Sequence, residues 1–240
     1  MATLVYHPAH ERGHLDHGWL DTWHSFSFAS WYNPAKVHFG MLRVLNDDTV
    51  AGGQGFGKHP HDNMEIITVV TTGALEHKDS MGHTQSIYPS EVQVMSAGTG
   101  ITHSEYNHDE YEPVHLFQIW IFPEQKNVTP RYEQVFFPEE GRNNQLQMLV
   151  SPIDNSDPGL KIHQQAWIYR ANLKAGVKVD CKPHTASHGL YIFVIEGSVA
   201  TEGRTLEKRD ALGVTDTEIV EVQAVTDSDV LILEVPMKTA

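Results

Sequence analysis

The chain has 240 residues, 40% of them hydrophobic and 20% charged, which is the composition of a folded globular protein and not of a disordered one. With 17 lysines and arginines against 31 aspartates and glutamates its net charge is −14, and this acidity argues against direct binding to nucleic-acid phosphates. The single cysteine excludes an intrachain disulfide framework, and neither the longest apolar runs (190–195 and 230–235) nor the first residues suggest a membrane span or a signal peptide, so we expect a cytoplasmic protein.

Short β-rich runs follow one another along the chain, and no long stretch has helical periodicity. In chain order, the runs expected to form strands are 40–45, 65–71, 92–95, 116–122, 147–150, 168–173, 190–195 and 230–235. Turn formers separate them, among them Asn46-Asp47-Asp48 and 155–159, and the polar segment 143–159, which ends in Ser-Asp-Pro-Gly, marks a domain boundary. Many short strands at close intervals are typical of an antiparallel sandwich or barrel. The sequence therefore predicts an all-β chain with an N-terminal domain at 1–142 and a C-terminal domain at 143–240.

A weak internal repeat supports this division. Around Gly73 and around Gly197 the chain reads strand, glycine turn, strand, as in a hairpin whose tight bend needs a positive φ. Superposing the two glycines places Pro183 and Thr185 where the first half has two histidines. The second copy thus keeps the strand pattern and has lost the potential ligands.

Two short strings in the N-terminal half carry potential metal ligands, His59-Pro60-His61 and His103-Ser104-Glu105. In an extended strand residues two apart point to the same face, so each string aims two donors at one side of a sheet. Three imidazoles and a carboxylate suit a divalent transition metal such as Fe, Ni, Mn, Zn or Cu. Taken singly, each string is equally consistent with ordinary loop or core histidines. Together they predict a metal site with coordination positions left open for a ligand.

The text around these strings is similar to known motifs. The motif residues are Gly53, His59, His61, Glu65 and Gly73, followed by Gly100, His103 and Asn107. They resemble the two glycine-bounded motifs of cupins. The wider text resembles the pirin family of bicupins, from about His14 to Glu133, in segments 18–28, 43–48, 59–61, 96–100 and 103–107. This resemblance implies two cupin barrels (double-stranded β-helix, or jelly-roll) in tandem, the N-terminal one binding metal and the C-terminal one degenerate.

The resemblance to pirins implies that the metal is bound by His59, His61, His103 and Glu105. A general cupin instead uses a carboxylate of the first motif, which here is Glu65. Strand parity permits both, since Glu65 shares the face of His59 and His61 if the strand is regular. We favour Glu105, because the His-x-Glu spacing brings its oxygen beside the His103 nitrogen, with Glu65 in an outer or pocket position. One divalent ion is expected, with Fe(II) preferred and Ni, Mn, Zn or Cu as alternatives.

Pirin relatives are associated with quercetin 2,3-dioxygenase activity, in which O₂ opens the central ring of a flavonol with loss of carbon monoxide. The resemblance therefore implies a metal-dependent dioxygenase acting on a small aromatic substrate and O₂, with Glu105 or Glu65 as the catalytic proton acceptor. The rival interpretation is a non-enzymatic, iron-dependent redox sensor or co-regulator whose acidic surface binds a protein partner. The aromatic residues between Trp19 and Tyr32 either line a pocket for a flat substrate or pin the N-terminal segment to the core.

Overall fold

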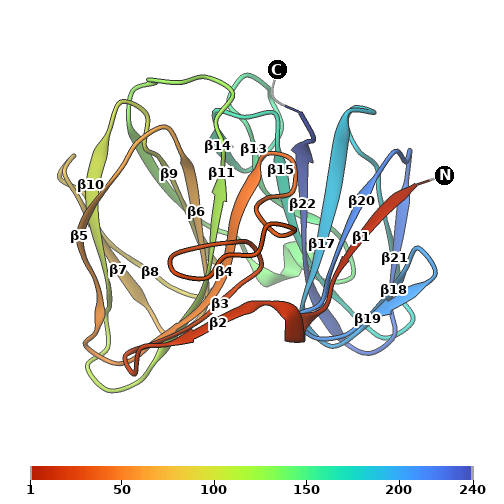
Figure 1. The fold of residues 1–240 in the computed structure, drawn as a ribbon, viewed down its shortest axis with the longest axis horizontal. Coiled ribbons are helices and arrows are strands. Elements are labelled where there is room, and N and C mark those ends of the chain that lie inside the picture. Colours follow the sequence, from red (N-terminus) through yellow and green to blue (C-terminus); the bar gives the residue numbers. More distant parts are fainter. Residues whose placement is uncertain (1, 239–240) are drawn as a thin grey trace.

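The computed structural model describes residues 2–238 and consists almost entirely of strands. They form two barrel-like halves that lie side by side, and each half combines a seven-stranded with a four-stranded sheet (Figure 1). The all-β prediction and the tandem arrangement are confirmed. Within residues 2–238, no helix has the length and apolar character needed to cross a membrane.

The N-terminal barrel is built from eleven antiparallel strands. Its larger sheet has the order β12-β9-β6-β11-β4-β3-β2, and its smaller sheet has the order β5-β10-β7-β8. In chain order these strands are β2 (Gly13–Asp16), β3 (Leu20–His24), β4 (Leu42–Val50), β5 (Gly55–His61), β6 (Glu65–Thr72), β7 (Leu75–Asp79), β8 (Thr84–Ile87), β9 (Glu91–Ser96), β10 (Ile101–Asn107), β11 (Val114–Ile121) and β12 (Arg131–Phe136). Both ligand strings lie on neighbouring strands of the smaller sheet, β5 and β10.

The C-terminal barrel has the sheet orders β1-β20-β17-β22-β15-β13-β14 and β16-β21-β18-β19. Its strands are β1 (Thr3–His7), β13 (Gln147–Pro152), β14 (Leu160–Ile162), β15 (Trp167–Leu173), β16 (Lys178–Cys181), β17 (His188–Glu196), β18 (Val199–Thr201), β19 (Arg204–Leu206), β20 (Ala211–Thr215), β21 (Val220–Ala224) and β22 (Ser228–Pro236). The first strand of the chain therefore crosses over to the second barrel. Two 3₁₀ turns, η1 (Ala9–Glu11) and η2 (Glu139–Arg142), follow β1 and β12. The sheet order and η2 support a domain boundary at 142/143, which stays a prediction.

The two seven-stranded sheets pack face to face, so their central strands, such as β6 and β17, are buried on both sides. The largest hydrophobic cluster draws on both halves, with Phe117 of β11 meeting Phe193 of β17 at 5.5 Å between ring centroids. Along β6, Ile67 and Val69 face this interface while Val70 faces the barrel interior. Burial on both faces explains why a run such as 190–195, in β17, is continuously apolar and does not alternate.

The two barrel interiors are filled differently. Fifteen buried hydrophobic residues fill the C-terminal barrel. The N-terminal barrel has smaller buried clusters and a cavity between its two sheets. The cavity of the N-terminal barrel lies at the two ligand strings.

Each of the eight runs expected from the sequence overlaps an observed strand. The polar segment Asn46-Asp47-Asp48 is the exception among the expected turns, because it lies inside β4. All three side chains are buried, and β4 pairs with β11 and β3 over this stretch. Tertiary pairing thus overrides the local turn preference of Asn and Asp.

Candidate metal centre

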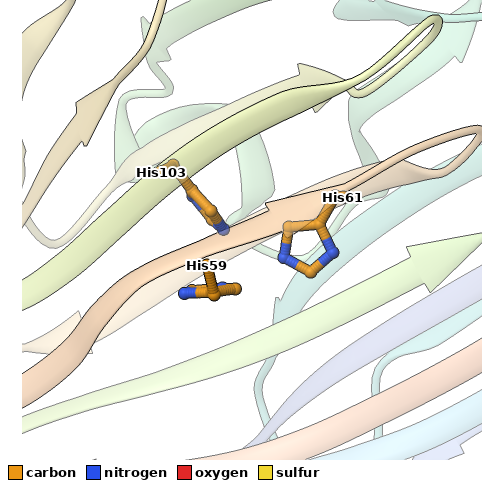
Figure 2. A group of neighbouring side chains, drawn as sticks. All are labelled: His59, His61 and His103. Atoms are coloured by element: carbon orange, nitrogen blue, oxygen red, sulfur yellow. The ribbon is translucent and has the colours of Figure 1, made fainter.

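The two histidine strings face each other across an antiparallel strand pair. In the register of β5 with β10, His59 lies opposite His103, and His61 lies opposite Ile101. The register shifts between His103 and Glu105, which marks a β-bulge. Neighbouring strands lie about 4.8 Å apart, so this register gathers three imidazoles from two strands (Figure 2).

The three rings form a close triangle. Their centroids are 4.8 Å apart for His59 and His61, 4.4 Å for His59 and His103, and 4.9 Å for His61 and His103. One nitrogen of each ring lies within 4.8 Å of the others. His59 Nδ1 lies 2.7 Å from the backbone carbonyl oxygen of Gly57, so in the neutral ring Nδ1 carries the proton and Nε2 keeps the lone pair.

The charge state of the rings suits a metal ion. Burial, reinforced by the neighbouring histidines, lowers the pKa of His61 and of His103 to about 3, so both rings are neutral at neutral pH. Among residues 2–238, His103 Nε2 is a buried nitrogen without a hydrogen-bond partner. A buried lone pair of this kind is costly unless something binds it. The donor set therefore fits a divalent transition metal.

Glu105 lies in the same pocket but in a different grouping. It is buried, and Gln118 Nε2 donates hydrogen bonds to its two oxygens at 3.2 and 3.4 Å. Burial raises the pKa of its carboxyl. Its nearest set of possible ligand atoms, all within 4.8 Å of one another, is shared with His103 and His77 and not with all three histidines of the triangle. A role for Glu105 as the fourth ligand stays a proposal.

Glu65 lies outside the pocket. The turn at 62–64, where Asn63 has a φ of 46°, separates β5 from β6 and breaks the strand parity that placed Glu65 beside the histidines. The carboxyl of Glu65 accepts a hydrogen bond from the Ser96 hydroxyl at 2.6 Å, and its neighbour Ile66 lines the cavity instead. The structure thus does not bring Glu65 to the three histidines.

The histidines open onto a cavity of about 220 Å³ between the two sheets of the N-terminal barrel. Aromatic side chains form part of its walls, with Phe28 and Trp120 in edge-to-face contact at 5.4 Å and Trp120 edge-on to His61 at 4.9 Å. The lining residues are Phe28, Asn46, Asp48, Phe56, His59, His61, Ile66, His103, Glu105, Gln118 and Trp120. Of the N-terminal aromatics, Phe28 lines the cavity, whereas Phe26 belongs to the core between the sheets and Trp19 packs against a buried cluster of the N-terminal barrel. The pocket interpretation therefore holds for Phe28 and the core interpretation for Phe26 and Trp19.

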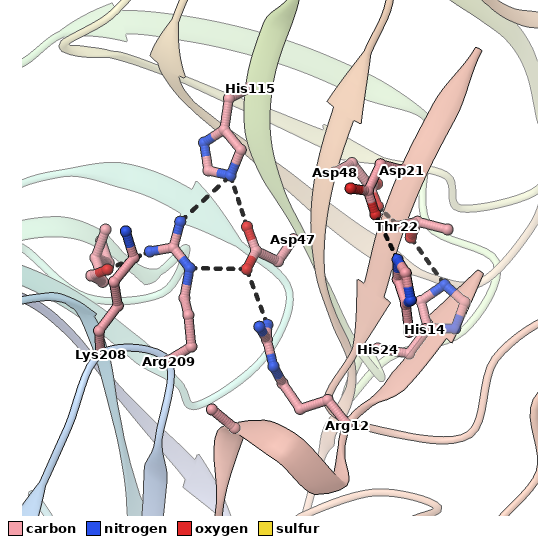
Figure 3. Close-up of polar contacts among 12 residues, drawn as sticks. Arg12, His14, Asp21, Thr22, His24, Asp47, Asp48, His115, Lys208 and Arg209 are labelled. Carbon is pink, nitrogen blue, oxygen red and sulfur yellow. Dashed lines mark hydrogen bonds and ion pairs between the residues drawn. The ribbon is translucent and has the colours of Figure 1, made fainter. Parts of the chain in front are cut away.

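Asp48 is a second carboxyl group in this cavity. It is 4% exposed, and the Thr22 hydroxyl donates a short hydrogen bond to its Oδ1 (Figure 3). Behind it, Thr22 Oγ1 lies 2.9 Å from His24 Nε2. Burial raises the pKa of Asp48 to about 7, and the nearby charges of Asp47 and Glu105 add to this effect. Asp48 can therefore exchange a proton near neutral pH.

Four polar residues around the site escaped the sequence analysis: Asn46, Asp48, His77 and Gln118. Asn46 and Asp48 belong to the segment expected to form a turn, although their spacing of two, continued by Val50, indicates one face of a strand. The string His77-x-Asp79 has the same spacing as the two ligand strings. This spacing is the signal that would have found Asn46, Asp48 and His77, whereas Gln118 lies inside the expected strand run 116–122 and carries no such signal.

Comparison with known proteins identifies the family. The Pirin family model matches residues 5–121, and the model of the quercetinase C-terminal cupin domain matches residues 148–235. Over 231 residues, covering 95% of this chain and 96% of the relative, the sequence is 46% identical to quercetin 2,3-dioxygenase of Escherichia coli K12. The chain belongs to the pirin family.

Solved structures confirm the pirin fold. A crystal structure of a bacterial pirin from Escherichia coli in complex with nickel(II) has a TM-score of 0.91 at 43% identity, covering 98% of this chain and 99% of that chain. A pirin-like protein of Caulobacter vibrioides is 38% identical over 227 residues, which cover 95% of this chain and 97% of the relative. The tandem cupin architecture expected from the motifs is therefore confirmed for both halves of this pirin.

Proposed function

We propose that this pirin is a metal-dependent dioxygenase that uses O₂ to open the central ring of a flavonol such as quercetin, with release of carbon monoxide. The observation that carries the proposal is the triangle of His59, His61 and His103 on the wall of an aromatic cavity. Relatives named quercetin 2,3-dioxygenase support it. A cytoplasmic location is part of the proposal, since Cys181 is a free buried thiol of the kind that reducing compartments maintain.

In this proposal the three histidines hold one divalent transition metal, with Glu105 as the fourth ligand. When bound, the ion supplies Lewis acidity and open coordination positions. We propose Fe(II) as the native ion, because imidazole and carboxylate ligands suit it, while the nickel(II) complex of the Escherichia coli relative makes Ni(II) the first alternative. Metal analysis of protein purified without added metal distinguishes the two.

The side chains of the cavity supply binding and proton handling. Phe28, Phe56 and Trp120 offer ring faces and edges to a flat substrate. The cavity of about 220 Å³ is smaller than the roughly 300–1,000 Å³ usual for drug-sized ligands, so a flavonol inserts its hydroxyl-bearing end and leaves the rest at the mouth. The acidic 3-hydroxyl of the flavonol gives its proton to a carboxylate in the cavity, either Glu105 or Asp48.

The test follows quercetin loss, O₂ uptake and carbon monoxide release by the metal-loaded protein. We expect one O₂ consumed and one CO released per quercetin in air, and no turnover under anaerobic conditions. His61→Ala should reduce turnover to background, whereas the exposed control His10→Ala should match the parent. A fully loaded protein without turnover, or ring cleavage that persists without O₂, would exclude the proposal. The first result would favour the rival function, an iron-dependent partner of another protein.

A further inference from the structure

A fourth histidine, His77, lies directly behind one of the three candidate ligands. Strand β7 pairs with the opposite edge of β10 from β5, and His77 lies across from Glu105 in this pairing. The His77 side chain is fully buried, and its Nδ1 lies 3.4 Å from Nδ1 of His103. On its other side, His77 Nε2 lies 3.3 Å from Oδ2 of Asp79. His77 thus bridges His103 and a carboxylate.

Asp79 is built to act as an acceptor. Its side chain is inaccessible to solvent. Its Oδ1 accepts the backbone N–H groups of Met81 at 2.9 Å and His83 at 3.1 Å, and its Oδ2 lies 2.9 Å from His83 Nδ1. Burial opposes ionisation, but these hydrogen bonds and the one from His77 outweigh it and lower the pKa of Asp79. An ionised carboxylate only accepts hydrogen bonds, so the nitrogens of His77 and His83 that face it carry protons.

Only one placement of protons on His103 and His77 is consistent with these contacts. Of the two ring nitrogens of His103, Nδ1 faces His77, whereas Nε2 is buried without a partner among residues 2–238. Nε2 is therefore the atom that is free to donate its lone pair to a metal. A neutral His103 ring then carries its proton on Nδ1 and donates it to Nδ1 of His77. The His77 ring in turn carries its proton on Nε2, where Asp79 accepts it. Each ring's tautomer is fixed by its neighbour.

An aromatic side chain packs against the hydrogen-bonded series His103–His77–Asp79. The ring of Tyr132, on β12, packs against His77 at 4.9 Å with an interplanar angle of 31°, and against His83 at 4.9 Å and 19°. Tyr132 donates its own hydroxyl proton to Gln134 at 2.7 Å. Stacking of this kind restricts rotation of both imidazoles and keeps His77 aligned with His103.

We propose that His77 is a positioning residue, which, backed by Asp79, holds His103 in the Nδ1–H tautomer and in the orientation that presents Nε2 to a metal ion. The alternative is that His77 itself is a ligand, because His77, His103 and Glu105 offer atoms within 4.8 Å of one another. Two observations favour positioning. His77 is absent from the cavity lining, and the nitrogen it turns toward His103 faces Nδ1 and not the unpartnered Nε2.

The inference is tested by metal affinity, which is measured without substrate and therefore does not depend on the dioxygenase proposal. Ni(II) binding is titrated against a competing chelator for the parent, His77→Phe and Asp79→Asn. Loss of an outer partner of a ligating histidine typically weakens binding by about 10–100-fold, and we expect this for both variants. His108→Phe, the same substitution just beyond β10, is the matched control and should bind as the parent does. Binding by His77→Phe within twofold of the parent would overturn the inference.

A second readout separates positioning from ligation. X-ray absorption spectra of the Ni(II)-loaded proteins count the imidazole ligands, and we expect the same count in the parent and in His77→Phe. A count that is lower by one would show His77 to be a ligand and would reject the proposal. His77→Gln guards against a folding defect, because its amide oxygen can accept from His103 and its NH₂ can donate to Asp79. The Ni(II) affinity of His77→Gln should return to within a few-fold of the parent. A loss of affinity equal to that of His77→Phe would reject the positioning role of His77.

Discussion

At the scale of single residues, Glu65 is a buried acid that lies outside the cavity. Its carboxyl is inaccessible, Ser96 donates one hydrogen bond to it, and its Oε1 has no side-chain or backbone partner among residues 2–238. Burial raises the pKa of Glu65 from 4.5 to about 7. A carboxyl group whose pKa is higher in the folded than in the unfolded state stabilises the fold fully below its unfolded-state pKa. This contribution is lost as pH rises through its folded-state pKa.

Glu65→Gln should therefore become more stable relative to the parent as pH rises from about 4.5 to about 8. The non-titrating amide avoids a cost of up to about 3 kcal/mol, since one pKa unit corresponds to about 1.4 kcal/mol. Urea unfolding of the metal-free proteins at both pH values measures the difference. The control Glu76→Gln, at a half-exposed position, should change stability little at either pH. A pH-independent difference for Glu65→Gln would contradict the assigned burial.

Asp48 gives a second prediction at this scale. If Asp48, and not Glu105, accepts the proton, it must be ionised to do so, and kcat on quercetin should rise through about pH 7, where burial places the pKa of Asp48. Asp48→Asn keeps the shape of the cavity and should lower kcat by about 100-fold or more and remove this rise from the pH profile, with metal content unchanged. An unaltered profile would assign the proton to Glu105 instead.

The residues of the site were predictable in so far as spacing reveals them. His59 and His61 were identified from a His-x-His pattern and His103 from a His-x-Glu pattern, and the structure brings these three histidines together. Glu105 stays a prediction, since its carboxylate groups with His77 and His103. Glu65 could not be placed from its spacing, because a turn between two strands resets the alternation that the argument needs.

At the scale of elements, the site depends on how closely β5 approaches β10. At Gly55 the two strands leave no room for a side chain, since a Cβ there would lie 2.3 Å from the backbone oxygen of Glu105 and 2.5 Å from Cα of Tyr106. Gly57, two residues along the same strand, has space, with Tyr106 Oη at 3.8 Å as its nearest neighbour. The two glycines are a matched pair for testing the strand contact.

Gly55→Ala should push β5 away from β10 and loosen the triangle of histidines. We expect a loss of about 1–3 kcal/mol in the free energy of unfolding, as for other overpacked sites, together with weaker Ni(II) binding. Gly57→Ala should leave both unchanged. Denaturant unfolding and chelator competition measure the two effects, and equal behaviour of the two variants would show that the strand spacing is not limiting.

Among the strands, sequence reasoning found the ones that are buried on both faces. All eight expected runs overlap strands that include the central members of the two large sheets, such as β6, β11, β17 and β22. The four strands of the smaller N-terminal sheet, β5, β7, β8 and β10, lie outside these eight runs. The ligand strings and the Gly73 hairpin indicated β5, β10 and β7, whereas nothing indicated β8. These strands are rich in polar residues, so they lack the apolar signal that marks a buried strand.

At the scale of the whole molecule, a buried ionic cluster joins the two barrels. Asp47 of β4 accepts hydrogen bonds from Arg12 at 2.9 Å and from Arg209, in the turn between β19 and β20, at 2.8 Å (Figure 3). His115 Nε2 lies 2.6 Å from the other oxygen. Burial opposes its ionisation, but His115, Arg209 and Arg12 outweigh it and lower the pKa of Asp47 to about 2. One carboxylate thus pairs with two guanidinium groups, Arg12 from the segment before β2 and Arg209 from the second barrel.

Asp47→Asn should destabilise the protein by about 3–5 kcal/mol, because it leaves two arginines buried without their counter-charge. Thermal and urea unfolding measure this loss. Glu221→Gln removes one partner of the half-exposed Lys178–Glu221 pair and should have little effect. Destabilisation of similar size in both variants would show that the cluster between the barrels has no special weight.

The sequence by itself determined the all-β class, the tandem cupin arrangement, the family and the three histidines. The all-β class and the three histidines follow from local spacing and apolar pattern, which the chain carries wherever it folds. The tandem cupin arrangement and the family followed from the resemblance of its motifs to those of pirins. Only the tertiary structure decided that β1 joins the second barrel, that Asp48 lies in the cavity and Glu65 does not, and that His77 and Asp79 stand behind His103. Each of these depends on strand register and on what covers the second face of a sheet, and neither is written into the spacing of neighbouring residues.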